Sequence, residues 1–153
     1  MGALAAGAGA ETNAETRRRL SAPAVRAFSA LAGKWKLSER EQLALLGDSV
    51  GRSTLYEWAK GTVRGTLNQD QLMRVSYLLG IYEGLERLWR RAPAEADAWV
   101  RRSIADYPFH GRQPLAFMIE GGLPAMAEAR AYIDGATGGP PSRADYIQPH
   151  HEG

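Results

Sequence analysis

Apolar residues at helical spacing limit the fold of this chain more than any other feature of its sequence. In the middle of the chain, Leu72, Val75, Leu78, Leu79 and Tyr82 form one broad apolar stripe. No segment shows the period-two alternation that is typical of a half-buried strand. The sequence therefore predicts an all-α protein.

Capping residues predict where the helices begin and end. Ser38 and Glu41 form a Ser-x-x-Glu capping box, and Asn68 with Gln71 predicts a similar start further on. Gly80 leaves open whether residues 81–89 form a helix of their own, and the Gly80 to Gly84 spacing indicates close helix packing. The expected helices cover residues 23–33, 38–47, 52–60, 68–80, 93–103, 114–120 and 124–134.

Composition divides the chain into four expected parts. The first residues are rich in Ala, Gly and Thr and have too little apolar content to offset the entropy of ordering. Pro93 starts a helix after a charge-rich segment, which places a boundary near Ala92. Gly138 to Pro141 end the last helix. We expect a flexible arm (1–20), a helical domain (21–92), a second helical domain (93–136) and a flexible, extended tail (137–153).

Composition also excludes several classes of protein. The chain has no cysteine, so it has no disulfides, thiol nucleophiles or thiolate metal sites. Its longest apolar run, Val75 to Tyr82, is too short to cross a bilayer, and its first residues lack a signal-peptide pattern. We therefore expect a cytoplasmic protein without a membrane partner. The net charge of +2 permits contact with nucleic acid but does not require it.

The segment from residue 37 to residue 61 has the pattern of a helix-turn-helix. One expected helix ends at Gly47, and the next carries Leu55 and Trp58 three residues apart, where both face the core. The outward side chains of the second helix would then meet DNA, although an ordinary helical hairpin with a solvated face fits the same pattern. The candidate DNA-binding residues are Arg52, Ser53, Tyr56, Lys60 and Arg64.

No pattern in the sequence predicts catalysis. His110 lies near Ser103 and Asp106 along the chain, but no nucleophile-elbow glycines surround that serine. His150 and His151 are adjacent residues in the expected tail and are poor joint metal ligands. The chain also lacks a phosphate-cradling glycine motif. We expect no catalytic residues, no metal and no cofactor.

Helix-breaking residues dominate the segment from Phe109 to Met126. Gly111 is expected in a turn conformation that other residues avoid, Pro114 starts a helix, and Gly121 with Gly122 ends it in a left-handed cap. The two helices are too short to be stable alone, so other apolar groups must cover them. A small helical subdomain and a partner-binding surface both fit this pattern.

The run from Trp99 to Asp134 resembles the toxin-binding domain of the Xre/MbcA/ParS antitoxins. Upstream, residues 45–89 are similar to the Xre-like helix-turn-helix that accompanies this domain, and together the two halves account for roughly Ala22 to Asp134. The residues that carry the resemblance in the second half are Trp99, Gly111, Arg112, Pro114, Leu115, Gly121, Gly122, Leu123, Arg130 and Tyr132.

The resemblance implies the antitoxin of a type II toxin–antitoxin operon. Its partner would be a RES-domain toxin that acts on NAD+, and the antitoxin would cover the toxin's NAD+ cleft. Its helix-turn-helix would bind operator DNA and repress the shared operon, and a homodimer is the expected state. A stand-alone transcription regulator with a C-terminal dimerisation domain remains the alternative. The expected toxin-binding residues are Gly111, Arg112, Pro114, Gly121, Gly122, Leu123, Tyr132, Tyr146 and Ile147.

Overall fold

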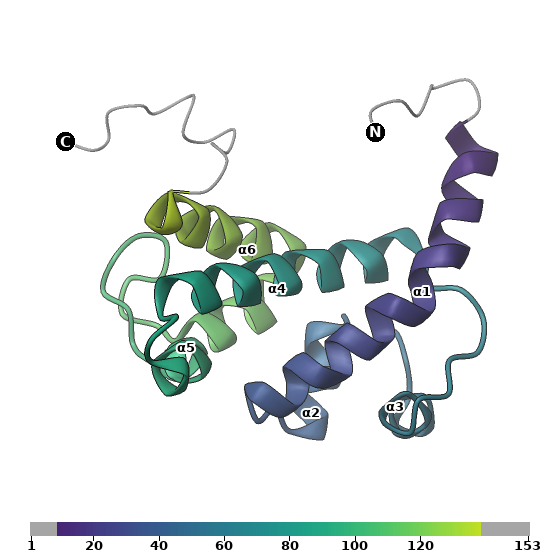
Figure 1. Ribbon diagram of the computed structural model, residues 1–153, viewed down its shortest axis with the longest axis horizontal. Helices are drawn as coiled ribbons and strands as arrows, with labels where there is room; N and C mark the ends of the chain where they lie inside the picture. The colour runs from purple at the N-terminus through teal and green to yellow at the C-terminus, as the bar shows by residue number, and fades with distance from the viewer. Residues whose placement is uncertain (1–8, 139–153) are drawn as a thin grey trace.

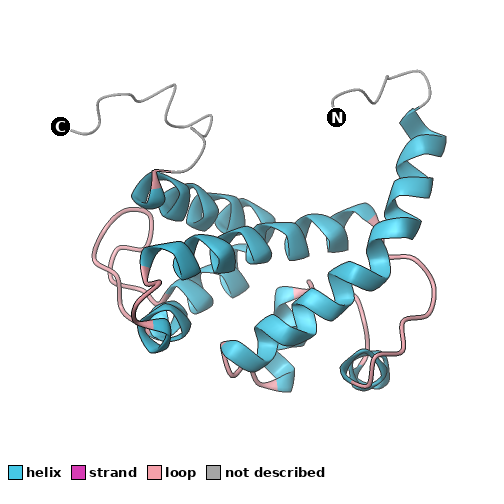
Figure 2. Cartoon of the chain, in the orientation of Figure 1, coloured by secondary structure: helices cyan, strands magenta, loops and turns pink. Residues whose placement is uncertain are grey.

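The computed structural model describes residues 9–138, which are helical with connecting loops and contain no strand (Figure 2). The expected tail, with Tyr146, Ile147, His150 and His151, lies outside the described residues. The helices are α1 (Gly9–Lys34), α2 (Glu39–Leu45), α3 (Arg52–Ala59), α4 (Gln69–Leu88), α5 (Pro93–Ala98), a 3-10 turn η1 (Trp99–Arg101), and α6 (Pro114–Thr137).

Helix α4 is the central element of the molecule. It packs against α6 on one side and against α1 on the other, and Figure 1 shows it running between them. Helix α3 lies near one end of α4, whereas α5 lies near the opposite end (Figure 1). None of the helices in the described range is long and apolar enough to cross a membrane.

Helix α1 begins earlier than the sequence predicts. Residues 9–20 are helical, which corrects the expected flexible arm at those residues and the expected helix start at Pro23, while residues 1–8 lie outside the described residues. Pro23 instead lies inside α1, where it removes one backbone hydrogen bond and accounts for the bend of α1 in Figure 1. Ser21 joins this part of α1 to the loop before α4: its buried Oγ donates to the carbonyl of Arg17 and accepts from the amide of Leu67.

The expected capping boxes are both present. The Ser38 side chain accepts from the amide of Glu41, and Asn68 accepts from the amide of Gln71, with the reciprocal bond formed in each case. Helix α4 then continues through Gly80 to Leu88 without a break, so residues 81–89 are not a separate helix. Gly80 is instead the place where α6 comes close, because an added Cβ would collide with the guanidinium of Arg130.

Helix α6 is kinked where the sequence predicts a helix end. Gly122 has φ 69° and ψ −148°, which are not helical, and Pro124 follows it. The positive φ is accessible to glycine and strained for other residues. The two expected helices, 114–120 and 124–134, are therefore the two arms of α6.

The buried side chains of both halves belong to one cluster. Leu45 and Leu55 from the helix-turn-helix and Val100 and Phe109 from the second half are all part of it. Helix α6 also contacts α2 directly. Within residues 9–138, the expected boundary near Ala92 therefore separates two stretches of sequence that share a single core.

Candidate functional site

Helix α3 is amphipathic: its apolar side chains face the core, and its polar side chains face solvent. Leu55 and Trp58 are buried, as the sequence predicts. The outward-facing Arg52, Ser53 and Tyr56 are exposed, and Tyr56 keeps 64% of its surface. Lys60 and Arg64, which follow the helix, are also exposed. All five candidate DNA-binding residues thus lie on solvent-exposed surface of α3 or directly after it.

Carboxylates hold two of these cations in the free protein. Arg52 Nε lies 3.0 Å from Glu39 Oε1, and Arg64 Nε lies 3.2 Å from Glu57 Oε1. Exposed pairs of this kind contribute only ~0–1 kcal/mol to stability, so phosphate oxygens could replace the carboxylates at little cost. Glu57, an unfavourable residue next to phosphates, is therefore partly neutralised by Arg64.

Lys60 is oriented by an aromatic ring rather than by a carboxylate. Its Nζ lies 4.9 Å from the centroid of the Tyr56 ring, within the range of a cation–π contact. Because both side chains are exposed, the contact places a cation and a phenol side by side on one face of α3. A phosphate group could accept hydrogen bonds from both.

The connection between α2 and α3 is fixed by a residue that sequence reasoning placed only at a helix cap. Gln71 is buried, its Oε1 accepts from the amide of Asn68, and its Nε2 donates to Ser49 Oγ at 2.9 Å. Ser49 Oγ in turn donates to the carbonyl of Leu46 at the end of α2. The start of α4 therefore positions the turn that orients α3.

Arg74 joins the same turn to α4 from the other side. Its Nη1 donates to the carbonyl of Leu45, and its Nε pairs with Asp70 at 2.8 Å. Gly47 has φ 72°, and an added Cβ there would lie 2.8 Å from the Arg74 guanidinium. A glycine at this position thus allows both the left-handed backbone and the close approach of the arginine.

In the second half, two backbone hydrogen bonds close the loop that precedes α6. The amide of Gly111 donates to the carbonyl of Ile104 at 2.7 Å, and the amide of Ile104 donates to the carbonyl of Arg112 at 3.2 Å. Gly111 has φ 91°, which agrees with the expected turn conformation. These bonds hold the exposed tip around His110 and Gly111 in a defined shape.

Arg112 leaves this loop toward α6. Its Nη2 pairs with Glu120 Oε1 at 2.7 Å, and the side chain is 40% exposed. Among the other expected toxin-binding residues, Gly121 is exposed, whereas Gly122 and Leu123 are half-buried at the kink of α6. Pro114 is buried, so in the free protein it starts α6 rather than offering a surface to a partner.

Phe109 anchors the loop before α6 in a cluster of aromatic side chains. Phe109 makes edge contacts with the rings of Trp99, Phe117 and Tyr132, at centroid distances of 5.6, 5.2 and 5.3 Å. Tyr132 also stacks on Trp99 and donates its hydroxyl to Asp106 at 3.1 Å. Burial, with the bond to the Asp106 carboxylate, raises the pKa of Tyr132. Tyr132 is therefore a structural support of the loop in the free protein.

No local pattern in the sequence indicates the link between this half and the helix-turn-helix. Arg101 binds Glu41 with two hydrogen bonds, of 2.8 and 3.0 Å, and donates to the carbonyl of Lys36. The bond to Arg101 is the largest cause that lowers the pKa of Glu41, from 4.5 to about 2. Because Glu41 also caps α2, one carboxylate ties η1 to the start of the helix-turn-helix.

The structure gives Asp106 and His110 partners other than each other. Asp106 accepts from Tyr132, and the His110 ring contacts the Tyr107 ring edge-on at 5.6 Å. No group of three or more His, Cys, Asp or Glu side chains in residues 9–138 could hold a metal ion.

Comparisons with known proteins agree with this geometry. Residues 14–80 match the family model of the antitoxin Xre-like helix-turn-helix domain, and the match starts within α1, before Pro23. The uncharacterized protein y4oB of Sinorhizobium fredii (strain NBRC 101917 / NGR234) is 38% identical over 113 residues, which are 74% of this chain and 83% of that protein. No solved structure matches the chain. The chain therefore belongs to the same family as y4oB, and an antitoxin Xre-like helix-turn-helix domain forms its N-terminal part.

Proposed function

We propose that the protein is an antitoxin that represses its own operon through α3 and neutralises a RES-domain toxin by covering the toxin's NAD+ cleft. The observation that carries the proposal is the exposed polar face of α3 within a domain of the antitoxin type. The second half supplies the toxin-binding surface in this proposal, with Arg112 and the exposed loop tip as its centre.

The DNA-binding half of the proposal rests on the position and chemistry of the α3 side chains. The first turn of a recognition helix meets base edges in the major groove, and this is where Arg52 and Ser53 lie. Arg52 can pair with the two acceptors of a guanine, whereas Lys60 and Arg64 are placed to contact phosphates. A homodimer would present two copies of α3 to two half-sites.

The experiment measures binding of a DNA fragment from upstream of the protein's own gene, at several salt concentrations, by fluorescence anisotropy. We expect Arg52→Ala to weaken binding by about 1–3 kcal/mol and to relax the preference for one base pair. Arg64→Ala should reduce the slope of log affinity against log salt by about 0.9.

Arg26→Ala is the matched control for both variants. Arg26 is an exposed arginine on α1, far from α3 in sequence, and has no ion pair among the described residues. The change removes the same charge, so it should leave both the affinity and the salt slope nearly unchanged. Equal losses in the three variants would show that net charge, and not the face of α3, determines binding.

The toxin-binding half rests on the fixed loop and on the likeness of the second half to the toxin-binding domain. The backbone bonds between Ile104, Gly111 and Arg112 keep the loop in one conformation, which limits the entropy lost when a partner binds. Arg112 is only partly exposed and is held by an exposed carboxylate, so it can exchange Glu120 for an acidic or phosphate group. In the proposal, Tyr146 and Ile147 extend this contact along the toxin cleft.

A further inference from the structure

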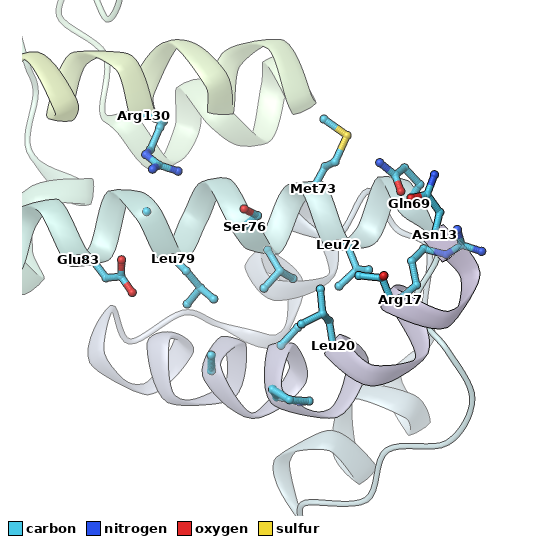
Figure 3. A pocket seen from close by; sticks show the side chains of 16 residues that line it. Asn13, Arg17, Leu20, Gln69, Leu72, Met73, Ser76, Leu79, Glu83 and Arg130 are labelled. Atoms are coloured by element: carbon cyan, nitrogen blue, oxygen red, sulfur yellow. The ribbon is translucent and has the colours of Figure 1, made fainter. Parts of the chain in front are cut away.

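A groove between α1 and α4 is not used by the proposed contacts with DNA or toxin. Its volume is about 730 Å³, and Arg130, which points from α6 toward α4 in Figure 3, also lines it. Its floor is apolar and consists mainly of Leu20, Leu72 and Leu79. Leu20 is 48% exposed and points from α1 toward α4 in Figure 3, whereas Met73, at 37% exposed, lines the edge of the groove and points away from α1. A hollow of this size with a mainly apolar lining can hold the side chains of another segment.

The two ends of the groove carry opposite charges without partners. Arg17 lies beside Gln69 at one end, and its Nε is buried without a hydrogen-bond partner among the described residues (Figure 3). Glu83 lies at the other end, is exposed, and makes no hydrogen bond or ion pair with a described residue. A buried donor without a partner is unfavourable, so the groove fits an occupant with an anion at the Arg17 end and a cation at the Glu83 end.

The described chain ends next to the Glu83 end of this groove. An added Cβ at Gly84 would lie 3.6 Å from Thr137 Cγ2, so the last turn of α6 packs on α4 beside Glu83. Gly138 then ends α6 in a left-handed conformation. The segment after Gly138 therefore starts level with Glu83 along α4, on the α6 side of that helix, and residues 139–142 can span the width of α4 to reach Glu83.

The sequence after Gly138 has the charges and apolar groups that the groove needs, in the right order. Arg143 comes first, Tyr146 and Ile147 are the only bulky apolar residues of this segment, and Glu152 follows. We propose that residues 139–153 dock in the α1–α4 groove of their own chain, with Arg143 at Glu83, Tyr146 and Ile147 on the apolar floor, and Glu152 at Arg17.

The lengths agree with this placement. Glu83 and Gln69 lie in the same helix and are about 21 Å apart, at about 1.5 Å per residue. An extended chain covers about 3.3 Å per residue, so Tyr146 and Ile147 reach about 10 to 13 Å beyond Arg143. That distance places them between Leu79 and Leu72, over the apolar floor. Glu152 then reaches Arg17 with some slack. Because the segment is tethered, its effective concentration at the groove is in the millimolar range, and weak contacts suffice.

Docking of residues 139–153 in the groove would require neither the toxin nor DNA. It adds a second site for Tyr146 and Ile147, which the proposed function places in the toxin cleft. In the free protein the groove would shelter these apolar groups, and binding of a partner would have to release them.

The test uses the absence of cysteine from the chain. The double variant Leu20→Cys with Tyr146→Cys joins the segment to the α1 side of the groove, and Leu72→Cys with Tyr146→Cys joins it to the α4 side. Arg26→Cys with Tyr146→Cys is the control, because Arg26 is exposed on α1 but does not line the groove. Each variant is oxidised as a full-length protein at several concentrations, and disulfide formation is followed by mass spectrometry and non-reducing gels.

We expect the two groove pairs to form an intramolecular disulfide at least about tenfold faster than the control pair, at a rate independent of protein concentration. Adding Glu83→Arg should slow the reaction, and adding Arg143→Glu to that variant should restore it. Equal rates in the groove and control pairs would overturn the proposal. Disulfides that form only between chains, when single-cysteine variants are mixed, would overturn it as well, because a second copy would then occupy the groove.

Discussion

At the scale of single residues, the ion pair of Arg101 and Glu41 makes the stability of the protein depend on pH. The pKa of Glu41 is 4.5 in the absence of its neighbours and about 2 in the folded protein. A carboxyl with a lowered folded pKa stabilises the fold at any pH above its unfolded pKa, and this contribution is lost as the pH falls toward the folded value. The contribution of Glu41 should therefore be complete above about pH 4.5 and disappear toward about pH 2.

We expect Glu41→Gln to have a lower melting temperature than the original protein at pH 7 and a smaller difference from it at pH 3. Circular dichroism during heating, at a series of pH values, gives this comparison. Glu15→Gln is the control, because Glu15 is exposed on α1 and has no ion pair among the described residues. The assignment fails if the Glu41→Gln curve falls with pH in parallel with that of the original protein.

Gly84 tests the close packing of α4 on α6. A Cβ at Gly84 would collide with the buried side chain of Ile133, which cannot move away easily. We expect Gly84→Ala to lower the free energy of unfolding by about 1–3 kcal/mol, as overpacking of a core does. At Gly80 the colliding group is the end of the flexible Arg130 side chain, so Gly80→Ala should have a smaller effect. Urea unfolding of the two variants measures the difference, and equal effects would argue against this packing.

Sequence patterns predicted local contacts well and long-range polar contacts poorly. The burial of Leu55 and Trp58 and the two capping boxes follow from spacings of three or four residues, and the structure confirms them. The pair of Arg101 and Glu41 joins residues 60 positions apart, so no local pattern can reveal it. The hydrogen bond from Gln71 to Ser49 joins residues 22 positions apart, so no local pattern indicates it either.

At the scale of elements, the kink of α6 depends on one glycine. Gly122 has φ 69° and ψ −148°, a region that is essentially restricted to glycine and costs about 1–3 kcal/mol for a residue with a Cβ. The nearest atom to an added Cβ is 3.8 Å away, so backbone strain and not collision is the expected effect. We expect Gly122→Ala to lower the free energy of unfolding by about that amount.

Gly33→Ala is the control for the kink. Gly33 lies in the last turn of α1 with no atom within 4 Å of an added Cβ and no positive φ. The same substitution there should be neutral or stabilise the protein by up to ~1 kcal/mol. If chemical denaturation shows both variants to be equally stable, the kink does not require glycine.

Most helices could be placed from their caps, and the exceptions have physical reasons. Pro23 resembled a helix start because proline is favoured in the first turn, yet the turns before it are helical, and Ser21 next to the bend binds the carbonyl of Arg17 and the amide of Leu67. Gly80 resembled a helix end, but the close approach of α6 requires a small residue inside α4. In both cases tertiary contacts outweigh a local preference.

At the scale of the whole molecule, the two halves of the chain share one hydrophobic core. Helix α4 starts at the turn that positions α3, and along its length it packs against α6, whose other contacts include α2. Contact of a toxin with the second half could therefore affect DNA binding by α3 through shared packing. The sequence predicted the two halves, but the shared core depends on contacts such as Gly84 with Ile133 that no local pattern indicates.

The most direct test of the antitoxin account is an NAD+ consumption assay on the product of the neighbouring gene, which the account predicts to be a RES-domain toxin, with and without this chain. We predict that an equimolar amount of the chain stops NAD+ consumption and co-purifies with the toxin. Arg112→Ala should protect less well, whereas Arg26→Ala should protect fully. Unchanged NAD+ consumption at several-fold molar excess of the folded chain would contradict the account.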